Sequence, residues 1–226
     1  MIADVDVSVP ASLIGDPTRA AFLTALSEGQ PLSAGELARR AGVTASTASI
    51  QLAKLVEAGL LSVEPNGRQR YYSLDDPALA AALEALALIA PVKPARSLKQ
   101  AQIGAALQSA RTCYDHLAGA LGVTLFDALI RKRVLTDELE VTTHGAARLR
   151  KLGIDVDGVA RGRRPLARRC LDWSERRHHL AGGLGAALAT RFFELGWIER
   201  MTSSRAVRVT QTGREALARE LGVTAE

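Results

Sequence analysis

A hairpin signal at residues 60–74 constrains the fold of this chain more than any other feature. Two β-prone runs flank Asn66-Gly67, a dipeptide that is the strongest short-range indicator of a β-hairpin. Three segments with helical spacing of apolar residues precede the hairpin. The order helix, helix, turn, helix, hairpin predicts a winged helix-turn-helix, in which the hairpin is the wing.

Local signals support each of the three helices. Asp16, Ser33 and Thr44 stand where side-chain oxygens can cap successive helix N-termini. A tight turn at Gly42-Val43 separates the second helix from the third. The third helix is expected to bury its apolar positions, Ala48, Leu52, Leu55 and Val56.

Composition excludes several classes of protein. Of 226 residues, 47% are hydrophobic and 23% charged, so neither wholesale disorder nor a fibrous repeat is expected. No apolar run reaches the roughly 18 residues of a membrane helix. Residues 1–10 have no basic segment typical of a secretory signal, and two cysteines are too few for a disulfide framework. These features predict a cytoplasmic protein without a membrane partner.

Charge is distributed unevenly along the chain. Residues 1–90 hold 6 Lys and Arg against 10 Asp and Glu, whereas residues 91–226 hold 23 against 14. The net charge of +5 permits a nucleic-acid partner. Because the N-terminal part is acidic, its non-specific binding to DNA is expected to be weak unless the basic part contributes.

Five segments within residues 8–90 carry a family resemblance. They are Leu13–Arg19, Glu36-Leu37-Ala38, Val43–Ser49, Leu52–Leu61 and Arg70-Tyr71-Tyr72. In these segments the chain resembles the ArsR/SmtB family of bacterial transcriptional regulators. The resemblance implies a homodimeric repressor that binds double-stranded operator DNA.

The residue types on the third helix and the wing suit the reading of DNA. A major groove admits one helix, whose N-terminal residues reach base edges, while basic residues nearby contact phosphates. Ile50 is expected either to touch a thymine methyl group or to be half-buried. The candidate DNA-binding residues are Thr44, Ser46, Thr47, Ser49, Ile50, Gln51, Lys54, Asn66, Arg68 and Arg70.

The positions at which many members of the family bind metal lack suitable ligands here. Residues 35–41, before the third helix, contain no Cys, His or Asp, and residues 77–89, after the wing, offer only Glu84. Transition-metal sites of this kind require thiolate or imidazole ligands. No metal or cofactor is therefore assigned. The Ala- and Leu-rich segment 77–89 is expected to pack in a dimer.

The chain continues far beyond the winged helix. Residues 1–90 are predicted to bind DNA and dimerise, 91–96 to form a linker, and 97–226 to form an α+β sensor domain. This extension is predicted to contain two winged-helix-like repeats, at about 111–155 and 168–224. The whole chain is thus expected to be mainly α-helical with short β-hairpins.

Two pairs of matching segments indicate the repeat. Cys113–Gly122 matches Cys170–Gly185 with six additional residues, and Val141–Gly145 matches Val209–Gly213. Each copy is predicted to contain a helix, a hairpin and a closing helix with Thr near its N-cap. The hairpins are expected at 134–135 with 139–141 and at 197–199 with 206–209.

The extension holds both cysteines and all four histidines. Cys113 and His116, three residues apart, are expected on one face of a helix, with Asp115 on another. The second copy offers Cys170 and His179, together with Asp172 and His178. We expect either a thiol switch or a pocket for a small molecule near Cys113 and Cys170. There are two alternatives: both thiols pack as small apolar groups, or the residues form a non-standard metal site.

Five arginines lie between residues 161 and 169, directly before Cys170. They are expected to attract an anion and, if close in space, to lower the pKa of Cys170. A solvated loop is the alternative.

Enzyme motifs are missing from the sequence. It contains no Gly-x-Ser-x-Gly, phosphate-binding loop or His-Glu-x-x-His. Helical neighbours such as Cys113, Asp115 and His116 point apart, whereas a nucleophile and its base must converge. The prediction is a sequence-specific repressor without enzymatic activity, released from DNA by a signal sensed in the extension. A protein-interaction module built on winged helices is the competing class.

Overall fold

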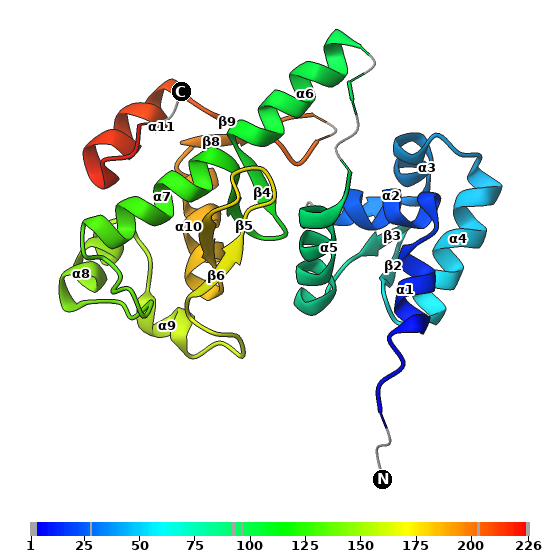
Figure 1. Cartoon of the computed structure of the whole chain (residues 1–226), viewed down its shortest axis with the longest axis horizontal. Coiled ribbons are helices and arrows are strands. Elements are labelled where there is room, and N and C mark those ends of the chain that lie inside the picture. Colours follow the sequence, from blue (N-terminus) through cyan, green and yellow to red (C-terminus); the bar gives the residue numbers. More distant parts are fainter. Residues whose placement is uncertain (1–3, 28, 92–93, 96, 203, 225–226) are drawn as a thin grey trace. The chain divides into compact units, whose positions relative to one another are not determined.

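The computed structural model describes residues 4–27, 29–91, 94–95, 97–202 and 204–224. The chain divides into two compact units, Met1–Leu83 and Glu84–Glu226. Both are mainly helical with short antiparallel strands, as the sequence predicts (Figure 1). Within the described ranges, no helix combines the length and the apolar character needed to cross a membrane.

The N-terminal unit is a winged helix-turn-helix. Its elements are α1 (Ser8–Ile14), α2 (Pro17–Leu26), β1 (Leu32–Ser33), α3 (Ala34–Ala41), α4 (Ala45–Glu57), β2 (Ser62–Asn66), β3 (Gln69–Ser73) and the start of α5 (Pro77–Ile89). The predicted caps are confirmed: Asp16 accepts hydrogen bonds from two backbone N–H groups of α2, Ser33 forms a reciprocal capping box with Glu36, and Thr44 caps α4.

Two elements of this unit have no counterpart in the sequence analysis. Helix α1 has no side-chain cap and no buried residue, so neither capping nor periodicity indicates it. Strand β1 is two residues long and is visible only through its pairing, with Leu32 opposite Tyr72. The sheet order is β1-β3-β2. The core beneath it consists of fully buried Phe22, Leu23, Leu37, Leu52 and Leu55.

In the described residues the C-terminal unit combines three two-stranded hairpins with several helices. Its elements are α6 (Leu98–Ser109), β4 (Arg111–Cys113), β5 (His116–Ala118), α7 (Gly119–Arg131), α8 (Thr143–Lys151), α9 (Val156–Ala160), β6 (Arg168–Leu171), β7 (His178–Ala181), α10 (Gly183–Glu194), β8 (Ile198–Arg200), β9 (Val207–Val209), α11 (Gln211–Ala216) and a π-helical turn (Leu217–Leu221). Within the predicted linker 91–96, Val92, Lys93 and Arg96 lie outside the described residues.

The two predicted repeats contain elements in a similar order. Hairpin β4–β5 leads into α7, and hairpin β6–β7 leads into α10. The closing helices α8 and α11 are capped by Thr142 and Thr210, as expected. The second predicted hairpin is present as β8–β9, but in the first copy it is reduced to one bridge between Leu135 and Val141. Duplication itself remains a prediction.

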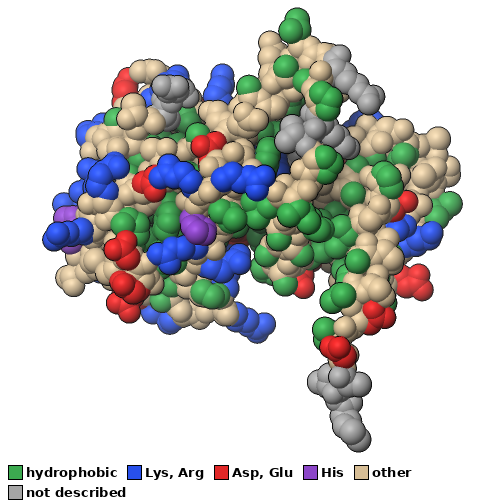
Figure 2. Space-filling view, in the orientation of Figure 1, with side chains coloured by type: hydrophobic (Ala, Val, Ile, Leu, Met, Phe, Trp, Pro, Cys, Tyr) green, Lys and Arg blue, Asp and Glu red, His purple; other side chains and the backbone are tan. Residues whose placement is uncertain are grey.

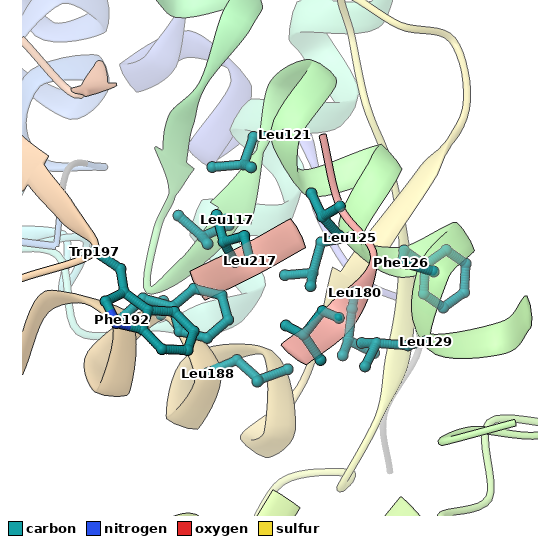
Figure 3. Packing of buried hydrophobic residues seen from close by; sticks show 14 of the residues in the cluster. Leu117, Leu121, Leu125, Phe126, Leu129, Leu180, Leu188, Phe192, Trp197 and Leu217 are labelled. Carbon is teal, nitrogen blue, oxygen red and sulfur yellow. The ribbon is translucent and has the colours of Figure 1, made fainter. Parts of the chain in front are cut away.

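One hydrophobic core connects the elements of the C-terminal unit. Residues of α7, α10, α11 and the π-helical turn contribute to it (Figure 3). Phe192 of α10 stacks on Trp197, with ring centroids 5.1 Å apart. Leu129 and Leu184 are fully buried on α7 and α10. The unit therefore has the apolar interior that independent folding requires.

Two glycines of the closing helices provide a test of this packing. A Cβ at Gly145 would overlap the carbonyl oxygen of Val134, and one at Gly213 would overlap that of Trp197. We expect Gly145→Ala and Gly213→Ala each to lower the free energy of unfolding by about 1–3 kcal/mol through overpacking. Denaturant titration monitored by tryptophan fluorescence measures this, since both tryptophans lie in the C-terminal unit.

Gly104 in α6 provides the matched control. A Cβ there would meet no atom within 4 Å. Gly104→Ala is therefore expected to stabilise the protein by about 0.5–1 kcal/mol, because alanine favours a helix interior. Equal effects at all three glycines would contradict the close approach at α8 and α11.

Candidate nucleic-acid interface and cysteine–histidine cluster

Helix α4 presents a polar N-terminal surface. Its cap, Thr44, accepts a hydrogen bond from the backbone N–H of Thr47. Gly42, in the left-handed conformation at φ 68°, ends α3 and turns the chain into α4. Buried Ala48, Leu52 and Leu55 fix the rotation of α4 about its axis, so the remaining face points to solvent.

Most of the predicted DNA-binding residues of α4 are exposed. Ser46, Ser49 and Lys54 lie on the solvent side, and Thr47 is half-buried. Ile50 is 58% exposed, which favours the thymine-contact alternative over the half-buried one. Gln51 is half-buried, and its side-chain oxygen accepts a hydrogen bond of 2.7 Å from Arg19 of α2. Ser49 and Ile50 are therefore more accessible to base edges than Gln51.

The wing has the expected position with a shifted turn. Asn66 pairs with Gln69, so the two residues of the loop are Gly67 and Arg68 rather than Asn66 and Gly67. Gly67 supplies the positive φ, 60°, that such a turn needs. Asn66, Arg68 and Arg70 are all exposed, as phosphate or minor-groove contacts require.

A second group of polar residues lies inside the C-terminal unit. Cys113, His116, Cys170 and His179, hereafter the Cys–His cluster, bring their ligand atoms within 4.8 Å of one another. The sulfur atoms of the two cysteines are 4.0 Å apart, and the Nε2 atoms of the two histidines are 3.2 Å apart. Cys113, His116 and His179 are buried and Cys170 is half-buried. The structure thus unites all four predicted sensor residues.

The prediction that Cys113 and His116 share a helical face is wrong. They lie on strands β4 and β5 and face each other directly across the hairpin, as Cys170 and His179 do on β6 and β7. Side chains directly opposite in an antiparallel pair lie on the same face. The turn after Cys113 uses Tyr114 at φ 58°, a conformation that Gly or Asn usually adopts, so the usual residue for this turn position is missing from the sequence.

The expected divergence of Cys113, Asp115 and His116 is therefore also wrong. Asp115 Oδ1 lies 3.2 Å from Nδ1 of His116, and Asp172 Oδ2 lies 3.1 Å from Nδ1 of His179. Each histidine thus has a carboxylate from its own hairpin behind it and its Nε2 facing the centre of the cluster. His178, the neighbour of His179, is exposed and takes no part.

Asp172 also binds Arg111, a residue that the sequence analysis missed. Both side chains are fully buried, with Arg111 Nη2 donating to Asp172 Oδ1 at 2.8 Å. The guanidinium also lies 4.5 Å from the centre of the Trp173 ring. A fully buried arginine has no sequence signature, but the recurrence of Cys-x-Asp in both copies does mark the two carboxylates.

The cluster shifts the pKa values of its members. The hydrogen bond between the two sulfurs raises the pKa of Cys113, as does burial, and the same bond lowers the pKa of Cys170, with help from His116 and His179. Burial opposes the charged form of His179, but Asp172 and Cys170 raise its pKa overall. Burial likewise disfavours the carboxylate of Asp172, yet His179 and Arg111 hold its pKa well below the usual range.

The five arginines before Cys170 are not what lowers its pKa, and their attraction of an anion stays a prediction. All five are exposed. Figure 2 shows many Lys and Arg side chains on the surface of the protein. Arg164 pairs with Asp115, and Arg169 donates to the backbone oxygen of Asp137. The pKa of Cys170 is indeed lowered, but by Cys113, His116 and His179 rather than by these arginines.

Two cavities bear on the expected ligand pocket. Between α7 and α10, beside the cluster, the space is about 10 Å³ and is lined by leucines and two glycines, Gly122 and Gly185. That volume accommodates no more than about one water. A larger cavity of about 430 Å³ lies elsewhere in this unit, bordered by Gln108, Thr124 and Glu175 among others.

Comparison with known proteins decides the family. The helix-turn-helix domain family HTH_20 matches residues 14–64. The HTH-type transcriptional regulator YdfF of Bacillus subtilis (strain 168) is 46% identical over 216 residues, which cover 94% of this chain and 96% of that protein. This chain belongs to the HTH-type transcriptional regulators. The regulator is a DNA-binding protein, and its similarity to YdfF extends through both the N-terminal and the C-terminal unit of the regulator.

Solved structures resemble shorter parts of the regulator. The transcriptional repressor BigR from Xylella fastidiosa is 30% identical, with a TM-score of 0.36, over 38% of this chain and 88% of that chain. The cadmium metal-sensor CMTR from Mycobacterium tuberculosis is 31% identical, with a TM-score of 0.33, over 41% and 99% respectively. The whole-chain relative therefore carries the family assignment.

The buried Asp172–Arg111 pair generates a stability prediction. Asp172→Asn is expected to lower the free energy of unfolding by about 3–5 kcal/mol, because Arg111 would remain buried without a counter-charge. The control is Asp127→Asn, which breaks the exposed ion pair with Arg177 and should cost no more than about 1 kcal/mol. Denaturant titration of both variants measures the two losses in free energy of unfolding. Similar losses would show that Asp172 has no special role.

Proposed function

We propose that the regulator is a repressor of the ArsR/SmtB type that binds operator DNA in the cytoplasm as a homodimer. A signal received by the C-terminal unit releases it from the operator. The observation that carries the proposal is the exposed polar surface of α4 next to a basic wing. The family segments of the sequence, from Leu13 to Tyr72, agree with it.

The exposed residues near the start of α4 contact the base edges. Ser46 and Ser49 offer hydroxyl groups to base edges, and Ile50 offers an apolar surface that suits a thymine methyl group. Lys54 on the same helix and Arg70 on the wing supply charge for phosphates. Phosphate contacts fix the register of the protein on DNA, while the α4 residues select the sequence.

Helix α5 forms the dimer contact. This helix is apolar on most faces and exposes Leu86 and Ile89, of which Ile89 is 81% exposed. A two-fold pair of winged helices places its recognition helices about 34 Å apart, in successive major grooves. The operator is therefore an imperfect palindrome.

The C-terminal unit receives the signal. It contains both cysteines, all four histidines and the cavity of about 430 Å³. These features support one of two signals: an oxidant that acts at Cys113 and Cys170, or a small molecule that binds in the cavity.

The phosphate contacts are tested by charge removal. Lys54→Ala and Arg70→Ala are each expected to weaken binding to every duplex and to reduce the slope of log K against log salt by about one. Arg219→Ala, which removes an exposed charge of the C-terminal unit, is the control and should leave the slope unchanged. Fluorescence anisotropy over a salt series measures all three. Full-length protein without preference for its own promoter at about 0.15 M salt would contradict the proposal and favour a protein-interaction module.

Contact with a thymine methyl group is tested by a double-mutant cycle. Ile50→Ala, and replacement of thymine by uracil at the contacted base, are each expected to weaken operator binding by about 1 kcal/mol, the contribution of a buried methyl group. Together they should cost little more than either alone, because both remove the same contact. Competition titrations with uracil placed singly through the half-site measure the coupling. Additive losses of binding free energy at every thymine would contradict the assignment of Ile50.

A further inference from the structure

The Cys–His cluster has the composition and geometry of a metal site. We propose that Cys113, His116, Cys170 and His179 bind one zinc ion in a closed tetrahedral site that joins hairpins β4–β5 and β6–β7. This inference uses the same two thiols as the oxidant signal but does not depend on operator binding, so metal binding and operator binding can each fail without the other.

The distances within the cluster fit a tetrahedral ion. With Zn–S bonds of about 2.3 Å and Zn–N bonds of about 2.0–2.1 Å, tetrahedral angles place two sulfurs about 3.8 Å apart and two nitrogens about 3.3 Å apart. The observed separations are 4.0 Å between the sulfurs and 3.2 Å between the Nε2 atoms. Four ligand atoms mutually within 4.8 Å thus need little movement to surround one ion.

The pairing of the strands explains why four ligands converge. Each hairpin contributes one cysteine and one histidine from directly opposite positions, Cys113 with His116 and Cys170 with His179. Strand β5 packs against β7, which brings the two pairs face to face. Each pair alone would be half a site, so the ion would connect segments 57 residues apart in the chain.

The residues behind the histidines also fit metal binding. Metal-ligating histidines usually donate their second ring N–H to a carboxylate, which fixes the tautomer and aims the other nitrogen at the ion. Asp115 and Asp172 occupy this position behind His116 and His179, at 3.2 Å and 3.1 Å. Both Nε2 atoms therefore face the centre of the cluster.

Charge and donor type select the ion. Binding requires both cysteines as thiolates and both histidines with an unprotonated Nε2, so any proton on these ligand atoms is released; two thiolates neutralise a divalent cation. Two sulfur and two imidazole donors in tetrahedral geometry are typical of zinc. With all four positions taken by protein, no ligand site stays open for a substrate, as in structural rather than catalytic zinc sites.

The first test measures metal directly on the full chain. Protein purified without chelator is expected to carry about one zinc per chain by elemental analysis. Apoprotein titrated with Co²⁺ should develop the visible bands of tetrahedral cobalt and a thiolate-to-cobalt charge-transfer band, both abolished by one equivalent of Zn²⁺. Folded wild-type protein that shows neither would overturn the proposal, as would a Cys113–Cys170 disulfide in protein isolated from a reducing cytoplasm.

Adjacent histidines supply a matched pair of variants. His179→Gln removes a ligand and is expected to lose the tetrahedral cobalt spectrum. His178→Gln changes the exposed neighbour on the same strand and is expected to keep it. Identical spectra and zinc contents in both variants would contradict the proposal.

A ligand exchange keeps the test decisive if ligand removal prevents folding. His116→Cys retains four donors and adds a third thiolate, so it should still bind one cobalt, with thiolate charge-transfer absorbance about 1.5-fold that of wild type. Unchanged absorbance in the folded variant would mean that residue 116 does not ligate the ion. Chelation of zinc from wild-type protein should also lower the unfolding temperature followed by tryptophan fluorescence.

Discussion

The C-terminal unit depends on the buried carboxylate of Asp172. One oxygen accepts hydrogen bonds from Arg111 and Ser174, and the other accepts from the backbone N–H of Gly119, where α7 begins. A buried charge is costly unless each of its hydrogen-bonding positions is satisfied. The partners come from β4, α7 and the turn after β6, so satisfying this carboxylate fixes the two halves of the unit relative to each other.

The position of the two histidines follows from the same arrangement. The Cβ of His179 lies over Gly122 of α7, and the Cβ of His116 lies over Gly185 of α10. Each histidine thus packs on the helix that follows the other hairpin. A side chain at either glycine would also overlap a backbone carbonyl, of Leu117 or Leu180, which explains why both copies have glycine there. Any change at the Cys–His cluster therefore reaches both central helices.

The two units use their polar residues in opposite ways. In the N-terminal unit most polar residues of α4 and the wing are exposed, and the buried core consists mainly of apolar side chains. In the C-terminal unit charged and titratable side chains, among them Arg111, His116 and His179, are buried. Exposed polar groups suit contact with a large partner such as DNA. Buried ones suit a site that holds a small ion or responds to a small chemical change.

The sequence by itself determined the elements that depend on contacts within a few residues. Helix caps at Asp16, Ser33 and Thr44, and the turn at Gly67, are interactions over two to four residues, which a local pattern records. The chemistry of the four sensor residues was also legible, because they recur in two matching segments. Only the tertiary structure decided that they converge. Their strands are three or four residues long and carry no periodicity, and the two cysteines are 57 positions apart; the packing of β5 against β7 brings them together, and no local interaction encodes that contact.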